Sequence, residues 1–222
     1  MTAPRPKDAA TLILIRHTGD GPKILMGRRA SGHSFMPDKY VFPGGKVDRC
    51  DRFIGTASEL SDDNHEALKA HNSARHPRAF ALAAIRETWE ETGLIVGKAG
   101  KLNTTTDDEG WRSYAAMDAV PALAPLNFIA RAITPPTRHK RFDARFFMAD
   151  ADAALMDDRP PQDGAEMLDL RWFSYDSALE LDLPNVTRFI LGEIAARLKD
   201  PKATHRPAFL RWTKGGHLMD RL

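Results

Sequence analysis

The chain has 222 residues, of which 42% are hydrophobic and 28% are charged, an ordinary composition for one sizeable globular domain. Its 32 basic and 30 acidic residues give a formal net charge of +2, so bulk electrostatics give no reason to expect a nucleic-acid or membrane-surface binder. The lone Cys50 excludes an intramolecular disulfide, no run approaches the ~18 apolar residues of a membrane span, and the start MTAPRPKDAA lacks the apolar core of a signal peptide; we therefore expect a soluble, cytoplasmic protein.

The first part of the chain predicts three extended segments and then a polar excursion. Residues 11–16 (TLILIR) are typical of a buried strand, and residues 23–29 (KILMGRR) are predicted to be its hairpin partner across the turn residues TGDGP. Residues 39–45 (KYVFPGG) form a third extended segment that ends in a Pro-Gly-Gly break. We interpret the polar stretch 52–76 as an insertion, with one short helix at about 63–71.

A helix is predicted over the sequence PRAFALAAIRETWEET that follows. Pro77 suits the first turn, and Gly93 can take the left-handed conformation that ends a helix. Small and apolar side chains follow the i, i+3, i+4, i+7 spacing of a face turned to a core. They are Ala81, Ala84, Ile85, Thr88 and Thr92.

The second half predicts further strands and one amphipathic helix, with a weakly patterned stretch between residues 101 and 125. The strands are expected at 94–97, 127–134, 141–149 and 168–174, the helix at 185–199, and a hairpin in the remaining tail. Strands that surround two helices without strict alternation indicate an α/β fold with a mixed sheet. We expect a single domain over 1–222, with the insertion at 52–76 and a C-terminal helix plus tail at 185–222.

The predicted helix 77–92 concentrates negative charge near its end. Glu87, Glu90 and Glu91 stand at i, i+3 and i+4, so their carboxylates share one face. Arg86 can pair with Glu90, but the i±3 and i±4 neighbours of Glu87 and Glu91 outside the cluster carry no positive charge. A like-charge i, i+4 pair costs about 0.2–0.5 kcal/mol, and the helix dipole disfavours each acid here by about 0.3–1 kcal/mol.

Two explanations account for this cluster: a solvated acidic face, or a site for a cation. The small apolar opposite face, the crowding at the helix end and the glycine that follows favour the cation. A hard divalent ion such as magnesium takes oxygen ligands, and the Pro-Gly-Gly turn at residues 43–45 offers bare backbone that can approach a ligand closely.

The sequence FPGGKVDRCD … AAIRETWEETGL resembles the signature of the Nudix hydrolases, which is a glycine, an acid six positions later, and Arg-Glu-apolar-x-Glu-Glu-x-Gly-apolar. The first half of the signature corresponds to Gly45 and Asp51. The residues that match its second half are Arg86, Glu87, Glu90, Glu91, Gly93 and Leu94.

Three features depart from the family pattern. Asp51 replaces a glutamate, which leaves the role of that position open, and Thr88 occupies a position that is usually aliphatic. Gly45 and Arg86 are 41 positions apart, about 27 more than in the family pattern, and the insertion accounts for the excess. Lengthening a surface loop costs little closure entropy, so we expect the two halves to meet. The long insertion resembles the branch that contains the peroxisomal coenzyme A diphosphatases.

The resemblance implies an α/β/α sandwich and hydrolysis of a nucleoside diphosphate linked to another moiety, with coenzyme A or its esters as the branch-level expectation. Glu87 and Glu91 would be the main ligands of Mg²⁺ or Mn²⁺, with Glu90 assisting and a carbonyl of the glycine turn, such as that of Gly45, completing the shell. Arg86 would orient the glutamates. Nudix domains are often dimers, so the resemblance also makes a homodimer an expectation.

Further roles are assigned outside the signature. Glu166, before the strand at 168–174, is the candidate general base, with a solvated loop acid as the alternative. The candidate substrate-binding residues lie in or beside strands. They are Arg28, Phe42, Arg141 and Arg145. The rival to an enzyme is a catalytically silent Nudix domain that binds nucleotides or regulates; because such modules commonly lose signature glutamates, the intact set favours the enzyme.

Overall fold

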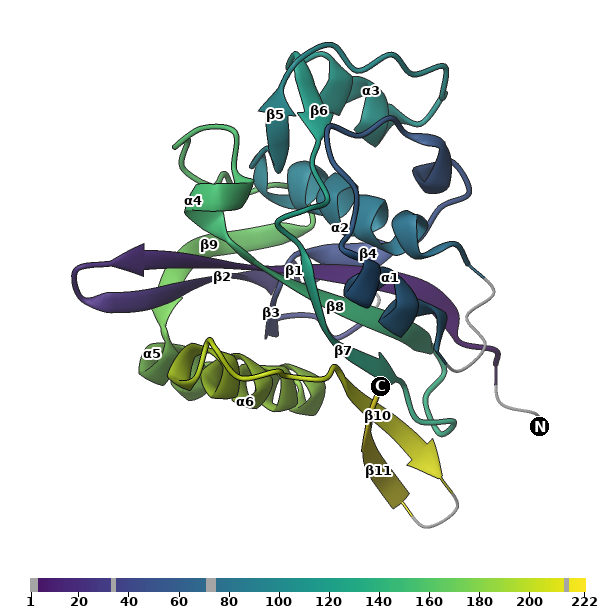
Figure 1. The fold of residues 1–222 in the computed structure, drawn as a ribbon. Coiled ribbons are helices and arrows are strands. Elements are labelled where there is room, and N and C mark those ends of the chain that lie inside the picture. Colours follow the sequence, from purple (N-terminus) through teal and green to yellow (C-terminus); the bar gives the residue numbers. More distant parts are fainter. Residues whose placement is uncertain (1–3, 33–34, 71–74, 214–215) are drawn as a thin grey trace.

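A computed structural model describes residues 4–32, 35–70, 75–213 and 216–222 of the chain. Its centre is a mixed nine-stranded sheet in the order β11-β10-β7-β8-β1-β2-β3, with β4 also paired to β1 and β9 to β2 (Figure 1). β1 lies parallel to β8, and β10 parallel to β7. The strands span Lys7–Thr18 (β1), Gly21–Arg29 (β2), Tyr40–Val41 (β3), Gly44–Lys46 (β4), Asn127–Ile133 (β7), Phe142–Asp150 (β8), Met167–Ser174 (β9), Ala208–Thr213 (β10) and Gly216–Arg221 (β11).

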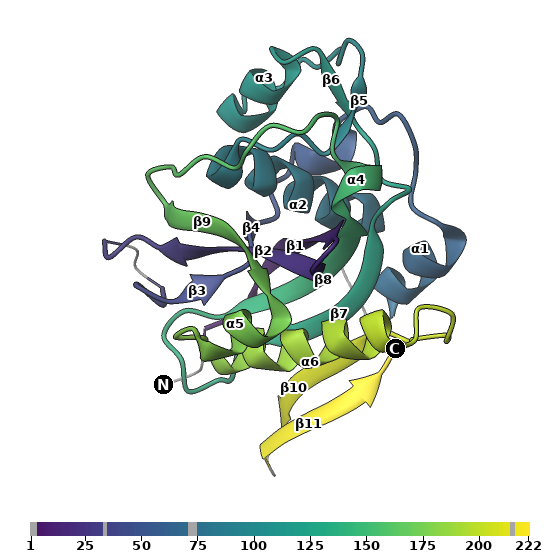
Figure 2. The same ribbon diagram turned by 90° about the vertical axis from the view of Figure 1, so that its left-hand side faces the viewer.

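Helices cover both faces of this sheet, which gives the expected α/β/α sandwich. One side carries α2, with α3 and a small second sheet beyond it, and the other side carries α5 and α6 (Figures 1 and 2). The remaining elements are the 3-10 turn η1 (Asp51–Phe53), α1 (Asp62–Lys69), α2 (Pro77–Thr92), β5 (Gly97–Ala99), α3 (Glu109–Ala115), β6 (Ala119–Pro121), α4 (Ala151–Ala154), α5 (Tyr175–Glu180) and α6 (Asn185–Lys199).

The central strand β1 contributes to a hydrophobic core on each face of the sheet. Leu12 and Leu14 pack into the core beneath α2, whereas Ile13 and Ile15 pack into the core beneath α6. Alternate side chains of a strand point to opposite faces, and all four are fully buried here. A strand covered on both sides is expected to be a continuous apolar run, which is the pattern seen at residues 11–16.

Helix α2 has the predicted bounds. Pro77 occupies its first turn, and Gly93 follows it with φ of 69° in the left-handed region. The predicted core-facing stripe is buried throughout. Thr88, in a position that is usually aliphatic in the family, donates from Oγ1 to the carbonyl oxygen of Ala84 at 2.7 Å, so its hydroxyl is satisfied inside the core.

The structure corrects two of the predicted strands and fills the weakly patterned stretch. Residues 39–45 form two short strands instead of one. The first, β3, pairs with β2, and the second, β4, pairs with β1. The strand predicted at 94–97 begins only at Gly97, where β5 pairs with β6. The stretch 101–125 contains α3 and β6. The short helix in the insertion is α1; the predicted end at His71 lies outside the described residues.

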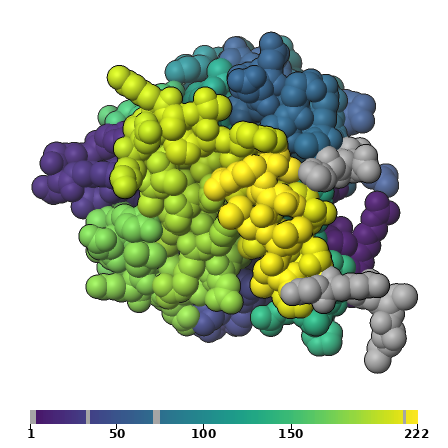
Figure 3. Space-filling model, turned by 60° about the horizontal axis from the view of Figure 1, so that its bottom comes forward, coloured from purple at the N-terminus to yellow at the C-terminus, as the bar shows by residue number. Residues whose placement is uncertain are grey.

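The C-terminal region contains the predicted helix and hairpin. α6 spans the expected 185–199, and β10 pairs antiparallel with β11 to extend the sheet. Figure 3 shows this region covering the face of the molecule that carries α6. Among the helices in the described part of the chain, none combines the length and the apolar character needed to cross a membrane.

Candidate active site

Two of the three glutamates of α2 contact the guanidinium of Arg86, which is only 3% exposed. Its Nη1 donates to Glu87 Oε1 at 2.9 Å and to Glu90 Oε2 at 3.2 Å. Burial opposes the charge of Arg86, but the carboxylates of Glu87, Asp51 and Glu90 together raise its pKa above the ordinary value. The arginine therefore stays charged and holds two of the three acids in place.

The contact between Arg86 and Glu87 differs from the expectation for the isolated helix. In an isolated helix, the i±3 and i±4 neighbours of Glu87 outside the cluster include no cation. In the folded chain the long Arg86 side chain also reaches the carboxylate of the next residue. One arginine thus offsets part of the repulsion, whereas Glu91 accepts a hydrogen bond from the Gly44 amide.

The other side of Arg86 is held by the first half of the signature. Its Nε donates to Asp51 Oδ1 at 3.0 Å, and its Nη2 donates to the carbonyl oxygen of Lys46 at 2.9 Å. Asp51 is fully buried and also accepts from Nε1 of Trp111 at 2.8 Å. The role of Asp51, left open by the sequence, is to anchor Arg86. The two halves of the signature meet in space, as predicted.

The glycine turn approaches the glutamates closely. The amide of Gly44 donates to Glu91 Oε2 at 2.8 Å. A Cβ built on Gly45 would lie 2.3 Å from Glu87 Oε2, so any larger residue there would displace that carboxylate. The Gly45 backbone lies beside Glu87, and its place in a metal shell stays a prediction.

Burial makes the ionised forms of these acids unfavourable. Desolvation, followed by the charge of Glu87, raises the pKa of Glu91 to about 8. Desolvation also raises the pKa of Glu87 to about 7, because the nearby Arg86 offsets only part of the effect, and it raises the pKa of Glu90. Buried carboxylates that resist ionisation are a common mark of functional sites, where a further positive charge is supplied on binding.

Oxygen donors of this kind fit a hard divalent cation. In the part of the chain that the structure describes, no three His, Cys, Asp or Glu side chains form a ready-made cage for a metal ion. The reason lies in the hydrogen bonds: Glu87 and Glu90 turn toward Arg86, and Glu91 turns toward Gly44. Rotation of carboxylates at the helix end would be needed to bring their oxygens together.

Three comparisons with known proteins bear on this arrangement. No family model matches the chain. The crystal structure of a Nudix hydrolase from Alicyclobacillus acidocaldarius superposes with a TM-score of 0.66 and 25% identity, covering 88% of this chain and 96% of that one. This chain is therefore similar to a Nudix hydrolase in fold and in sequence. Its acidic cluster lies on α2 with the glycine turn in front of it, the arrangement that the signature resemblance predicts.

Curated relatives agree with this assignment at low identity. Nudix hydrolase 7 of Caenorhabditis elegans is 28% identical, over 75% of this chain and 50% of its own length. A Xenopus laevis protein named acyl-coenzyme A diphosphatase NUDT19 is 23% identical, over 78% of this chain and 63% of its length. This chain therefore spans between half and two thirds of the length of the two relatives.

Glu166 lies near the Nudix helix, as its predicted role requires. The loop before β9 runs along the end of α2, where the Gln162 amide donates to the carbonyl oxygen of Thr92 at 2.9 Å. The charge of Glu166 contributes to raising the pKa of Glu91. Its side chain is exposed, so a base at this position is open to solvent. Its assignment as the general base stays a prediction.

Four side chains were predicted to bind substrate, and the structure places two of them in the interior. Phe42 is 3% exposed and packs in the core beneath α6, on the opposite face of the sheet from the glutamates. Arg145 is 1% exposed, pairs with Asp143 at 2.8 Å, and has its pKa lowered to about 10 by burial. Both are committed to the fold, so we leave them out of the substrate contacts.

The other two arginines lie nearer the surface. Arg28 pairs with Asp38 at 3.2 Å with its side chain 34% exposed. Arg141 donates to the carbonyl oxygens of Thr134 at 3.0 Å and Pro4 at 2.8 Å, so it joins two segments of backbone. Within the described part of the chain, neither arginine forms a hydrogen bond or salt bridge with the glutamates, and their substrate-binding roles stay predictions.

Two residues near the site were missed by the sequence analysis. Arg29, at the end of β2, lies close enough to Glu91 to lower its pKa against the effect of burial. Trp111 holds Asp51 from α3, in the stretch that had no clear pattern. The signal for α3 was an N-cap: Asp108 accepts from the Trp111 amide at 2.9 Å, and an aspartate before EGWRSYA is a helix-start signal.

Proposed function

We propose that this chain is a metal-dependent Nudix pyrophosphohydrolase that cleaves a nucleoside diphosphate linked to another moiety. One observation carries the proposal: buried Glu91 and half-buried Glu87 stand side by side at the end of α2, and desolvation raises the pKa values of Glu87 and Glu91 to about 7 and 8. Such an arrangement destabilises the ionised protein unless a cation joins it. A divalent ion and a pyrophosphate together supply the missing charge balance.

The residues of the chain fit a Mg²⁺ or Mn²⁺ ion. Glu87 and Glu91 would be its main ligands, Glu90 would assist, and the carbonyl of Gly45 would complete the protein contribution. When bound, such an ion neutralises phosphate charge and lowers the pKa of a water ligand. Arg86 keeps the carboxylates aimed in one direction, and it remains charged because four carboxylates surround it, those of Glu87, Glu90, Asp51 and Asp48.

Other side chains have supporting roles in this proposal. Glu166 takes the proton of the attacking water as the general base, and its exposed position beside the end of α2 leaves it accessible to that water. Arg28 and Arg141 contribute positive charge toward the phosphates, and Arg29 adds positive charge beside Glu91.

We place the activity in the cytoplasm, and a homodimer is the assembly that the family resemblance favours.

For the substrate, we propose coenzyme A or one of its esters. The support is the name of the Xenopus relative, acyl-coenzyme A diphosphatase, together with the long insertion in the signature. Nucleotide sugars and dinucleotides are the competing substrates. Fold alone does not choose among them, because selectivity depends on the loops around the site.

A substrate panel with a matched variant tests the proposal. The protein is incubated with Mg²⁺ and coenzyme A, acyl esters, nucleotide sugars or dinucleotides, and products are identified by mass. We expect paired phosphate-bearing products, and a loss of kcat by orders of magnitude in Glu91→Gln, which keeps the shape of the side chain. Absence of turnover on every substrate would favour the silent module, and near-normal turnover by Glu91→Gln would refute the ligand assignment.

A further inference from the structure

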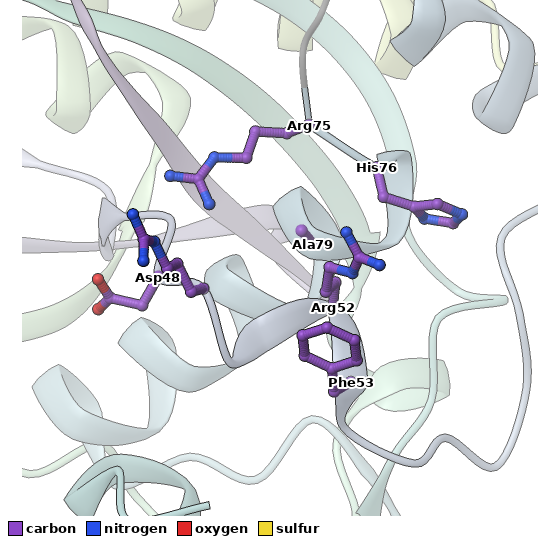
Figure 4. Close-up of a pocket in the computed structure, with 7 residues that line it drawn as sticks. Asp48, Arg52, Phe53, Arg75, His76 and Ala79 are labelled. Atoms are coloured by element: carbon purple, nitrogen blue, oxygen red, sulfur yellow. The ribbon is translucent and has the colours of Figure 1, made fainter.

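Two cavities lie beside the N-terminal half of α2, next to the insertion. The first, which we call the insertion cavity, has a volume of about 500 Å³ and is lined by Asp48, Arg49, Arg52, Phe53, Arg75 and His76, arranged around Ala79 of α2 (Figure 4). The second, of about 430 Å³, is lined by Arg5, Lys7, Asp8, Lys46 and Arg75. Arg75 belongs to both, so the cavities adjoin. Volumes of this size are typical of small-ligand sites.

Both cavities are strongly cationic. Three arginines face one carboxylate in the insertion cavity, and four cations face one carboxylate in the second. Because Arg75 is shared, six cations face two carboxylates. The resulting excess of four positive charges is larger than the +2 of the whole chain. A local excess of positive charge therefore lines these two adjoining cavities of a near-neutral protein.

The two carboxylates neutralise this surface only in part, because each also pairs with an arginine outside the lining, Arg145 for Asp8 and Arg86 for Asp48. Asp8 lies 3.3 Å from Arg75 and 3.4 Å from Arg145. Asp48 lies 3.5 Å from Arg86, the residue that holds the Nudix glutamates. Within the described part of the chain, neither Arg49 nor Arg52 forms a salt bridge, and both are exposed. Two arginines thus face the insertion cavity with their charge available.

The backbone amides at the N-terminus of α2 do not attract an anion to the cavity, because they are already hydrogen-bonded. The amide of Arg78 donates to Nδ1 of His76 at 3.3 Å, and the amide of Ala79 donates to the His76 carbonyl oxygen at 2.9 Å. The arginine side chains therefore carry the charge of the site. Phe53, 72% exposed, adds an apolar wall with Arg52 stacked 4.4 Å over its ring.

The insertion cavity opens on the same side of α2 as the catalytic glutamates. Ala79 and Arg86 are seven positions apart, which returns to the same face of a helix and spans about 10 Å along its axis. Asp48 connects the two places, since it lines the cavity and contacts Arg86. A ligand whose pyrophosphate is anchored at the glutamates can therefore place a second group in the cavity, if that group lies about the length of one nucleotide from the pyrophosphate.

We propose that the insertion cavity binds a phosphate monoester carried by the substrate, separate from the pyrophosphate held at the Nudix glutamates. Planar guanidinium groups match phosphate oxygens in bidentate pairs, and Arg49 and Arg52 are the residues that contact this group. The inference rests on the proposed function and gives the insertion a role: it selects nucleotides that bear an additional phosphate.

Binding of two nucleotides that differ by one phosphate tests the inference without any need for turnover. Adenosine 3′,5′-bisphosphate and adenosine 5′-monophosphate are titrated into the full chain by calorimetry at one salt concentration. The wild type is expected to bind the bisphosphate about tenfold or more tightly. The double variant Arg49→Ala/Arg52→Ala should lose this preference. Lys199→Ala, which removes one positive charge from α6 on the other face of the sheet, should keep it.

The outcomes separate this inference from the proposed activity. Equal affinity for the two nucleotides, binding of neither, or an unchanged preference in the double variant would overturn the phosphate subsite even if the chain hydrolyses a pyrophosphate. A preference that Arg49 and Arg52 carry would support the subsite even in a chain without turnover. Inorganic phosphate is the third probe: if it binds at the two arginines as tightly as the bisphosphate does, the cavity takes free phosphate and the substrate assignment is wrong.

Discussion

Replacing Gly45 by alanine places one methyl group against a proposed metal ligand. The added Cβ would lie 2.3 Å from Oε2, 2.4 Å from Cδ and 2.6 Å from Oε1 of Glu87. Ordinary contact begins at about 3.4 Å, so the whole carboxylate must move by about 1 Å. Gly45 does not have a positive φ, so alanine fits its backbone and the effect comes from the displaced side chain.

The displacement should affect catalysis far more than folding. Moving a reacting or coordinating group by about 1 Å commonly reduces the rate by about 10²-fold. Loosening the contact between Glu87 and Arg86 destabilises the fold by about 1–2 kcal/mol, which corresponds to a fall in Tm of only a few degrees for a chain of this length. We therefore expect Gly45→Ala to fold, to bind Mn²⁺ more weakly and to lose about two orders of magnitude in kcat.

Steady-state kinetics, calorimetric titration of Mn²⁺ and thermal melts measure the three effects. Gly55→Ala is the matched control, because its added Cβ would meet only Leu102 at an ordinary 3.6 Å and its activity should equal that of the wild type. A Gly45→Ala variant with normal kcat and normal Mn²⁺ affinity would show that the position of the Glu87 carboxylate is irrelevant to the reaction.

Three further predictions concern the same helix and its surroundings. In metal-free protein the pKa values of Glu91 and Glu87, about 8 and 7, exceed the ordinary 4.5, so the folded state binds these protons more tightly than the unfolded state. This contribution is fully present below about pH 4.5 and is lost as pH rises through 7 and 8. Denaturant melts in EDTA should show that the free energy of unfolding falls by an amount on the order of a few kcal/mol as pH rises through this range, and saturating Mn²⁺ should suppress the fall. A free energy of unfolding that does not change with pH in metal-free protein would contradict the pKa values. Gly110→Ala would put a Cβ 1.6 Å from Glu90 Oε1, so kcat should fall about tenfold or more while Tm changes by a few degrees at most, since only the end of a flexible side chain must move; unchanged kcat would remove Glu90 from the site. Gly192→Ala, exposed within α6 with no atom within 4 Å of the added Cβ, should raise the free energy of unfolding by about 0.5–1 kcal/mol, measured by denaturant melts, without changing kcat; a loss of stability would contradict the open space around it.

The fold was largely predictable because its main elements have one dominant local signal each. The β-branched and leucine run at 11–16 is typical of a buried strand, and Pro77 and Gly93 mark both ends of α2. The segment 39–45 was misread because which strand a residue pairs with depends on long-range topology. Local sequence gives no sign that β3 pairs with β2 and β4 with β1.

The site was predictable where helix geometry alone decides it. Spacing placed Glu87, Glu90 and Glu91 on one face, and it predicted the i, i+4 pair between Arg86 and Glu90. It did not reveal Trp111, which reaches Asp51 across 60 positions of sequence, nor the burial that turns Phe42 and Arg145 away from any ligand. Strand residues alternate between faces, so a shift of one position decides whether a side chain meets substrate or core.

The account depends most directly on cation binding by Glu87 and Glu91. Calorimetric titration of Mn²⁺ at pH 7, in the presence of a non-hydrolysable diphosphate, measures it. We predict saturable uptake by the wild type, accompanied by proton release because the raised carboxyl pKa values must fall on binding, and strongly weakened uptake by Glu91→Gln. Identical titrations for the two proteins, or no heat of binding in the wild type, would contradict the central claim.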